Sequence, residues 1–197
     1  MRELLFPGRR VWVAPASERA TPRTTQFTLA LVESPAPSGG AASLVSVNTL
    51  IPNRLVAQAL RARSLPQFHD YTDIRAEVPH GHSRFDFVLS AGEARCVVEV
   101  KSVSLVNGRC GLFPDAVSAR ATRHVQELAA LRQRGARAAV LFVAQRDDID
   151  EIRPAEEIDP AFASAMINAK GAGVDFFGFR CEVSLNGIRF GAPVPVR

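Results

Sequence analysis

The chain has 197 residues and a mass of 21.3 kDa, enough for one ordinary domain or for a small domain and a medium one. With 47% hydrophobic and 22% charged residues, it has the composition of a globular protein that buries a core. Charges interrupt every apolar run before it is long enough to cross a bilayer, and the first eight residues lack the apolar stretch of a secretory signal. We therefore expect neither a membrane protein nor a secreted one.

The three cysteines, Cys96, Cys110 and Cys181, are odd in number and widely spaced. They predict neither a disulfide framework nor a zinc knuckle, and they fit a reducing compartment. The expected location is cytoplasmic.

The net charge is +4, and the basic character lies in the first two thirds of the chain, because the last third is net negative. Residues 1–63 hold eight Arg and three Glu, whereas residues 138–197 hold six basic and nine acidic residues. A mildly basic chain is compatible with a polyanionic partner, although many enzymes without one have the same balance. Of the 24 basic residues only Lys101 and Lys170 are lysine, so each offers a compact ammonium in a chain that otherwise uses planar guanidinium groups.

The sequence pattern predicts that residues 1–50 form a small β module. Segments 10–14 and 27–33 alternate apolar with other residues, and 43–47 is a candidate third strand. The loops between them are rich in Ser, Pro, Thr and Gly. Because two or three strands are marginal on their own, we expect residues 1–50 to depend on the rest of the chain.

From residue 51 onward the pattern predicts a mixed α/β domain extending to residue 197, with a sheet flanked by helices. The predicted helices are 53–63, a long one starting at Phe113-Pro114-Asp115 and running to about Arg134, and one from Asp159-Pro160 to about Lys170. The long helix has an apolar stripe of Val117, Ala121, Val125, Leu128 and Leu131. The predicted strands are 74–78, a hairpin over 84–103, a buried strand over 138–144, one over 174–180 and a second hairpin turning at Asn186-Gly187.

The first hairpin carries the residues with the most evident chemistry. Glu99 and Lys101 point to the same face of one strand, and Asp86 lies on the partner strand. Two carboxylates at the end of an apolar sheet are costly unless a cation lies between them, and such oxygen ligands suit Mg²⁺ or Mn²⁺. A metal ion there could polarise a phosphoryl oxygen and activate water, while Lys101 could orient that water or neutralise charge on phosphorus.

The alternative is an edge hairpin on which Glu99 and Lys101 form a surface ion pair and Asp86 is solvated. Glu99 interrupts an otherwise apolar run, which favours a buried functional acid, but the residues alone leave both interpretations open. Glu77, one short strand upstream, is either a third carboxylate of the site or an ordinary surface residue.

The remaining polar groups give weaker signals. His80 and His82 flank a glycine, but no further His or Cys follows at zinc-binding spacing, so we expect turn residues. Arg120 and Arg123 lie with His124 and Gln126 on a basic helix face, which, like Arg84 beside Asp86, could contact phosphates or be simply solvated. The sequence contains no Walker loop, GxGxxG or GxSxG, so nucleotide cofactors and serine hydrolysis have no support.

Four segments taken in order resemble the sugar fermentation stimulation protein A (SfsA) family: VSVNTLIPNR (45–54), SRFDF (83–87), VEVKSV (98–103) and FPDAV (113–117) with Arg120. The resemblance covers nearly the whole chain. It implies an N-terminal OB-like domain, here residues 1–50, and a PD-(D/E)xK (restriction-endonuclease-like) nuclease domain, here residues 51–197. It further implies Asp86, Glu99 and Lys101 as the nuclease signature, Glu77 as an accessory metal ligand, Mg²⁺ or Mn²⁺ as cofactor, and nucleic acid as substrate.

Family members usually have further sequence ahead of the equivalent of residue 2, so we expect the OB-like module to be partial. The first functional hypothesis is a metal-dependent DNA or RNA nuclease in which Asp86 and Glu99 hold the metal, Lys101 assists the attacking water, and Arg84, Arg120 and Arg123 contact the backbone. The second is a non-catalytic DNA-binding regulator of sugar metabolism on a nuclease scaffold. The third is a truncated product without stable function. A homodimer is compatible with the fold.

Overall fold

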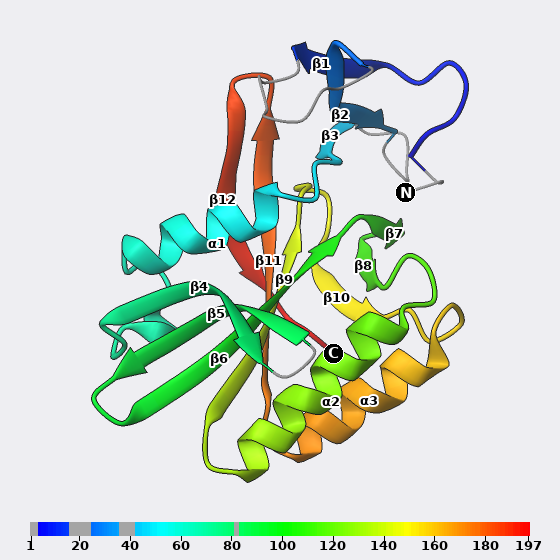
Figure 1. Cartoon of the computed structure of the whole chain (residues 1–197). Helices are drawn as coiled ribbons and strands as arrows, with labels where there is room; N and C mark the ends of the chain where they lie inside the picture. Colours follow the sequence, from blue (N-terminus) through cyan, green and yellow to red (C-terminus); the bar gives the residue numbers. More distant parts are fainter. Residues whose placement is uncertain (1–3, 16–24, 36–41, 81–82) are drawn as a thin grey trace.

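A six-stranded mixed sheet forms the centre of the molecule in the computed structural model, which describes residues 4–15, 25–35, 42–80 and 83–197 (Figure 1). Its strand order is β12-β11-β9-β6-β5-β4. The strands are β4 (Asp73–His80), β5 (Ser83–Ala91), β6 (Ala94–Val103), β9 (Arg137–Ala144), β11 (Asp175–Ser184) and β12 (Gly187–Val194). Strands β6, β9 and β11 are parallel, whereas β5 pairs antiparallel to β6, β4 antiparallel to β5, and β12 antiparallel to β11. The mixed α+β architecture is the one predicted from the sequence.

Helices cover both faces of this sheet. The helix α1 (Ile51–Arg61) packs on one face, and the pair α2 (Ala119–Gln133) and α3 (Pro160–Gly171) packs on the other (Figure 1). The central strand β9 serves both cores, because Val140 and Phe142 point towards α2 and α3 whereas Leu141 and Val143 point towards α1. This double burial explains the continuous apolar run that predicted a central strand.

The hairpin that carries the candidate residues forms as predicted. Strands β5 and β6 pair antiparallel, with Phe87 opposite Val98, and the turn between them uses Gly92 at a φ of 58°. The prediction of a second hairpin at Asn186-Gly187 is also confirmed, since β11 and β12 pair antiparallel across that turn.

The long helix starts later than predicted. Phe113 is the last residue of the short strand β8 (Cys110–Phe113), and α2 begins only after Ser118, whose Oγ accepts a hydrogen bond from the Ala121 backbone N–H at 3.2 Å. Val117 therefore precedes the helix and is 76% exposed, so its predicted place in the apolar stripe is wrong. The strand β8 lies between β7 (Leu105–Asn107) and β10 (Glu151–Pro154) in a small sheet that the sequence did not predict.

The described part of residues 1–50 forms a three-stranded antiparallel sheet of β1 (Val11–Pro15), β2 (Phe27–Ser34) and β3 (Ser43–Ser46). Its core is small, consisting of Leu4, Val32 and Val45 with two partly buried neighbours. Hydrogen bonds attach this sheet to the segment after β9: the Ser46 backbone N–H donates to the Gln145 carbonyl, and the Arg146 guanidinium donates to Ser34 Oγ. None of the described helices combines the length and the apolar character needed to cross a membrane.

Candidate functional site

An open cavity of about 820 Å³ lies between the β5–β6 hairpin, the start of α1 and the first half of α2. Every site residue predicted from the sequence lines this cavity: Glu77, Arg84, Asp86, Glu99, Lys101, Arg120 and Arg123. The fold thus brings together on one surface residues that lie up to 46 positions apart in the chain, from Glu77 to Arg123. The structure adds Asn53 from α1, together with Ser118 and His124 from the α2 region.

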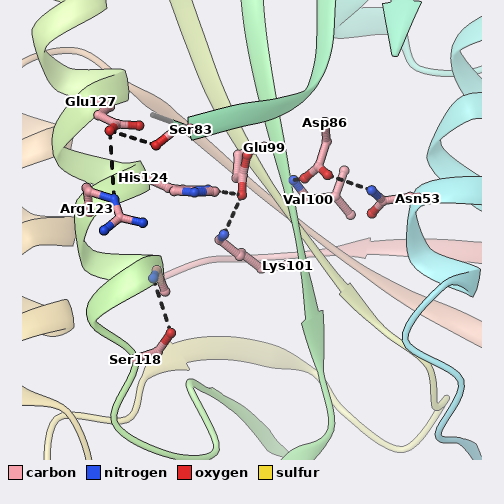
Figure 2. A network of polar contacts seen from close by, with 11 residues as sticks. Asn53, Ser83, Asp86, Glu99, Val100, Lys101, Ser118, Arg123, His124 and Glu127 are labelled. Atoms are coloured by element: carbon pink, nitrogen blue, oxygen red, sulfur yellow. Dashed lines mark hydrogen bonds and ion pairs between the residues drawn. The ribbon is translucent and has the colours of Figure 1, made fainter. Parts of the chain in front are cut away.

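Asp86 is held by two donors from different elements. Its Oδ1 accepts a hydrogen bond from Asn53 Nδ2 at 2.6 Å, and its Oδ2 accepts one from the Val100 backbone N–H at 2.7 Å (Figure 2). Burial and the neighbouring Glu99 carboxylate raise the pKa of Asp86 above its usual value, although both hydrogen bonds act in the opposite direction. Without a cation, this carboxylate is therefore held in place but is costly to ionise.

Glu99 is almost fully buried and has the opposite shift. Its Oε1 accepts hydrogen bonds from Lys101 Nζ at 2.6 Å and from His124 Nδ1 at 2.5 Å (Figure 2). Burial favours the neutral acid, but the hydrogen bonds and the charge of these two partners outweigh it and lower the pKa of Glu99. The cavity therefore holds two carboxylates whose surroundings shift their pKa values in opposite directions, a pattern typical of functional sites.

The second oxygen of Glu99 has no such partner. Glu99 Oε2 is buried and finds no hydrogen-bond donor among the described residues. A buried carboxylate oxygen without a partner costs free energy, and a cation would satisfy it. The donor set is chemically suited to a hard divalent ion, because Asp86 and Glu99 both supply carboxylate oxygens to the same cavity.

In the described part of the chain, no group of three or more His, Cys, Asp or Glu side chains is close enough to hold a metal together. An ion bound by Asp86 and Glu99 would need waters or substrate oxygens to complete its coordination, as Mg²⁺ commonly does. Glu77 lies in β4 between Ala76 and Val78, which pair with Phe87 and Phe85 of β5, and it has a φ of 56°, which is rare for a residue with a side chain. Its exposed carboxylate pairs instead with Arg84, at 3.3 Å.

The helix α2 contributes a basic side and one buried group. Arg120 and Arg123 line the cavity, and Arg123 Nε lies 4.0 Å from Glu127 Oε1, which also accepts a hydrogen bond from Ser83 Oγ at 2.9 Å (Figure 2). The prediction that His124 lies on this basic face is wrong, because the side chain is 2% exposed and faces the sheet.

Sequence reasoning missed the roles of Asn53 and His124. The helical spacing could have placed His124 inside, because it lies three residues after Ala121 and four before Leu128, both buried. Asn53 gives no such signal, since its contact with Asp86 spans 33 residues of sequence. Of the predicted histidine turn, His80 ends β4 with its ring 5.2 Å from that of Phe85, and His82 lies outside the described residues.

A second cavity, of about 580 Å³, adjoins the first. It lies between the N-terminal sheet and the β11–β12 hairpin, and Thr49 and Leu50 at the start of α1 line both cavities. Arg54, on the first turn of α1, belongs to the second cavity.

Comparisons with known proteins agree on one family. The family model described as "Sugar fermentation stimulation protein RE domain" matches residues 50–187. Sugar fermentation stimulation protein homologues from Moorella thermoacetica and Desulforamulus reducens are 41% and 39% identical to the whole chain, which spans 82% and 79% of their lengths. A solved structure described as Pyrococcus furiosus SfsA in complex with Ca²⁺ superposes with a TM-score of 0.88 at 24% identity, over all of this chain and 81% of that one.

Proposed function

The chain belongs to the sugar fermentation stimulation protein family, and from that premise we propose that it is a metal-dependent nuclease that hydrolyses phosphodiester bonds in DNA or RNA on a PD-(D/E)xK scaffold. The observation that carries the proposal is the pair of carboxylates in one cavity, Asp86 with a raised pKa and Glu99 with a lowered one, beside a buried lysine. The three residues come from two adjacent strands and therefore keep a fixed spacing.

Asp86 and Glu99 are the proposed ligands of Mg²⁺ or Mn²⁺. The unpartnered Glu99 Oε2 supports this assignment, and so does the Ca²⁺ in the name of the Pyrococcus furiosus structure. Such an ion, when bound, supplies Lewis-acid polarisation of a phosphoryl oxygen and lowers the pKa of water. Glu77 is the proposed accessory ligand, and it would have to exchange its ion pair with Arg84 for that role.

Lys101 is the proposed water-orienting group. Its ammonium group contacts Glu99 Oε1, and the side chain is buried at the edge of the cavity. A compact cation with three N–H donors can there donate to both a water molecule and a phosphate oxygen. A chain that otherwise uses arginine almost throughout carries lysine here.

The arginines are the proposed phosphate contacts. Arg84 extends from the hairpin, while Arg120 and Arg123 extend from α2, so guanidinium groups border the cavity from two elements. A guanidinium binds phosphate oxygens through two parallel N–H donors, and these contacts position a strand without reading its sequence.

The test is a cleavage assay on labelled DNA, RNA and hybrid substrates with Mg²⁺, Mn²⁺ or EDTA. The chain offers a matched control, because its only other lysine, Lys170, lies at the end of α3, outside the site. We expect Lys101→Met to lose cleavage by about 100-fold or more, as removal of a transition-state charge partner does, and Lys170→Met to cut like the unmodified chain. Equal cleavage by the two variants would contradict the role of Lys101.

The second candidate function is a DNA-binding regulator that does not cut. What favours it is that both oxygens of Asp86 and one oxygen of Glu99 already accept hydrogen bonds from the protein, so three of the four carboxylate oxygens have partners without a metal. In the same assay, metal-independent binding with a steep salt dependence and no product would support this function over the nuclease.

A further inference from the structure

A buried histidine and a lysine share one oxygen of Glu99. His124 Nδ1 and Lys101 Nζ both donate to Oε1, from α2 and from β6 respectively (Figure 2). The two donors differ in conformational freedom, because Lys101 has a flexible four-carbon side chain whereas the imidazole ring of His124 is rigid. The His124 ring is also packed edge-on against Phe85, with ring centroids 6.4 Å apart.

This arrangement decides which carboxylate oxygen is available. With Oε1 engaged by two donors, the rotation of the carboxylate is fixed, and Oε2 is left without a protein donor among the described residues. A lysine alone could follow the carboxylate as it turns, whereas a buried imidazole anchored on a helix cannot. His124 is thus the contact that sets the orientation of Glu99.

We propose that His124 is a positioning residue for the metal site: its Nδ1–H fixes Glu99 so that Oε2 is presented to a divalent cation. This inference rests on the proposed function, because it assigns Glu99 Oε2 the role of a ligand to the proposed cation. It also gives the two donors different roles. Lys101 can leave Oε1 and donate to water or phosphate, while His124 keeps Glu99 in place.

The proposal predicts that geometry at position 124, rather than polarity, controls metal affinity. In His124→Asn the amide nitrogen takes the place of Nδ1 and can still donate to Oε1. In His124→Gln the amide nitrogen lies near the place of Nε2 and cannot make the same bond. Groups that orient a metal ligand typically change affinity by about 10–100-fold when removed.

The experiment is calorimetric titration of the full chain with CaCl₂ at pH 7.5, beside thermal melting of each variant without metal. We expect His124→Gln to bind Ca²⁺ about 10-fold or more weakly, His124→Asn to stay within about threefold of the unmodified chain, and Lys101→Met to bind at least as tightly. Val125→Ala, which truncates the next buried residue of the same helix, should lower the melting temperature and leave the affinity unchanged.

Two results would overturn the inference, and they are distinguishable. If the unmodified chain binds Ca²⁺ and His124→Gln binds within twofold of it, His124 is a packing residue and the metal site stands without it. If neither chain binds Ca²⁺, Mn²⁺ or Mg²⁺, the metal site of the proposed function fails and the role of His124 fails with it.

Discussion

At the scale of single residues, Asp86 and Glu99 show how the surroundings set the behaviour of two like groups. Glu99 is the more buried, yet its pKa is lowered because His124 and Lys101 donate to it. Asp86 has only neutral donors, Asn53 and the Val100 N–H, so burial and the Glu99 charge prevail and its pKa is raised. The metal-free protein therefore carries one stable carboxylate and one that is costly to ionise.

Asp86→Asn should stabilise the metal-free protein at neutral and higher pH. A carboxyl whose pKa is raised by folding contributes stability that is fully present below its unfolded pKa and is lost as the pH rises through the folded pKa. Asparagine removes that loss, and it keeps both contacts if the Asn53 amide turns to present its oxygen. We expect the variant to melt about 2–4 °C higher at pH 8, the change that about 1 kcal/mol causes in a domain of this size.

This gain should shrink as the pH falls and disappear below the unfolded pKa of aspartate, where Asp86 is protonated in both states. Under the proposed function, added Mn²⁺ should raise the melting temperature of the unmodified chain and leave that of Asp86→Asn unchanged, because the variant keeps only one of the two charged ligands. A metal-free Asp86→Asn protein that melts below the unmodified chain at pH 8 would contradict the ionisation cost assigned to Asp86.

At the scale of elements, short sequence patterns predict correctly the helices, strands and turns that form through interactions between neighbouring residues. The β5–β6 hairpin, the buried β9 and the cap of α3 at Asp159-Pro160 all follow from patterns within a few residues, and all are confirmed. Pro114 resembles a first-turn proline and so predicts too early a start for α2, whereas the cap is Ser118 and Phe113 pairs in β8. The contacts that complete the site, Asn53 with Asp86 and His124 with Glu99, span 33 and 25 residues and are visible only in the fold.

Asp159 should prove more important than a helix cap usually is. Its Oδ1 accepts from the Phe162 N–H that opens α3, and its Oδ2 accepts from the Ser118 N–H that precedes α2, while the side chain is buried. Asp159→Ala removes the cap and leaves a second N–H without its acceptor. We expect it to lower the free energy of unfolding in urea by about 2–3 kcal/mol, from about 1 for the cap and 1–2 for the second group.

Ser118→Ala is the matched comparison for Asp159→Ala, because it removes only the α2 cap. Its expected cost is about 1 kcal/mol, the usual value for a lost cap. If both variants lose the same stability, the hydrogen bond between Asp159 and Ser118 contributes nothing and the two helices start independently.

At the scale of the whole molecule, the N-terminal sheet and the main domain meet at a buried charged group. Arg146 binds Asp148 through two nitrogens, at 2.5 and 2.7 Å, and also donates to the Ser104 carbonyl and to Ser34 Oγ. No sequence pattern predicts that Arg146 is buried, because an arginine that follows an apolar strand is ordinarily expected on the surface. It connects β2 to the segment after β9, and the N-terminal sheet in turn lines the second cavity, which shares Thr49 and Leu50 with the first.

If nucleic acid is the substrate, as proposed, the second cavity predicts that binding depends on the length of the strand. Arg54 lines the second cavity and not the first, so under the proposed function it would meet a phosphate other than the one at the bond that is cut. We expect Arg54→Ala to weaken binding of a 15-nucleotide strand about 5-fold and to reduce the salt dependence of binding by about one ion, the effect of one lost phosphate contact. Binding of a trinucleotide and the turnover number should stay unchanged.

Arg61, exposed at the far end of the same helix, provides the control for Arg54. Since α1 rises about 1.5 Å per residue, seven residues separate the two Cα atoms by roughly 10 Å along the helix axis, and Arg61 lines neither cavity. Arg61→Ala should therefore bind both strands like the unmodified chain. Fluorescence anisotropy across a salt series measures all three proteins, and equal losses for Arg54→Ala and Arg61→Ala would mean that the strand is attracted by overall charge and does not follow the second cavity.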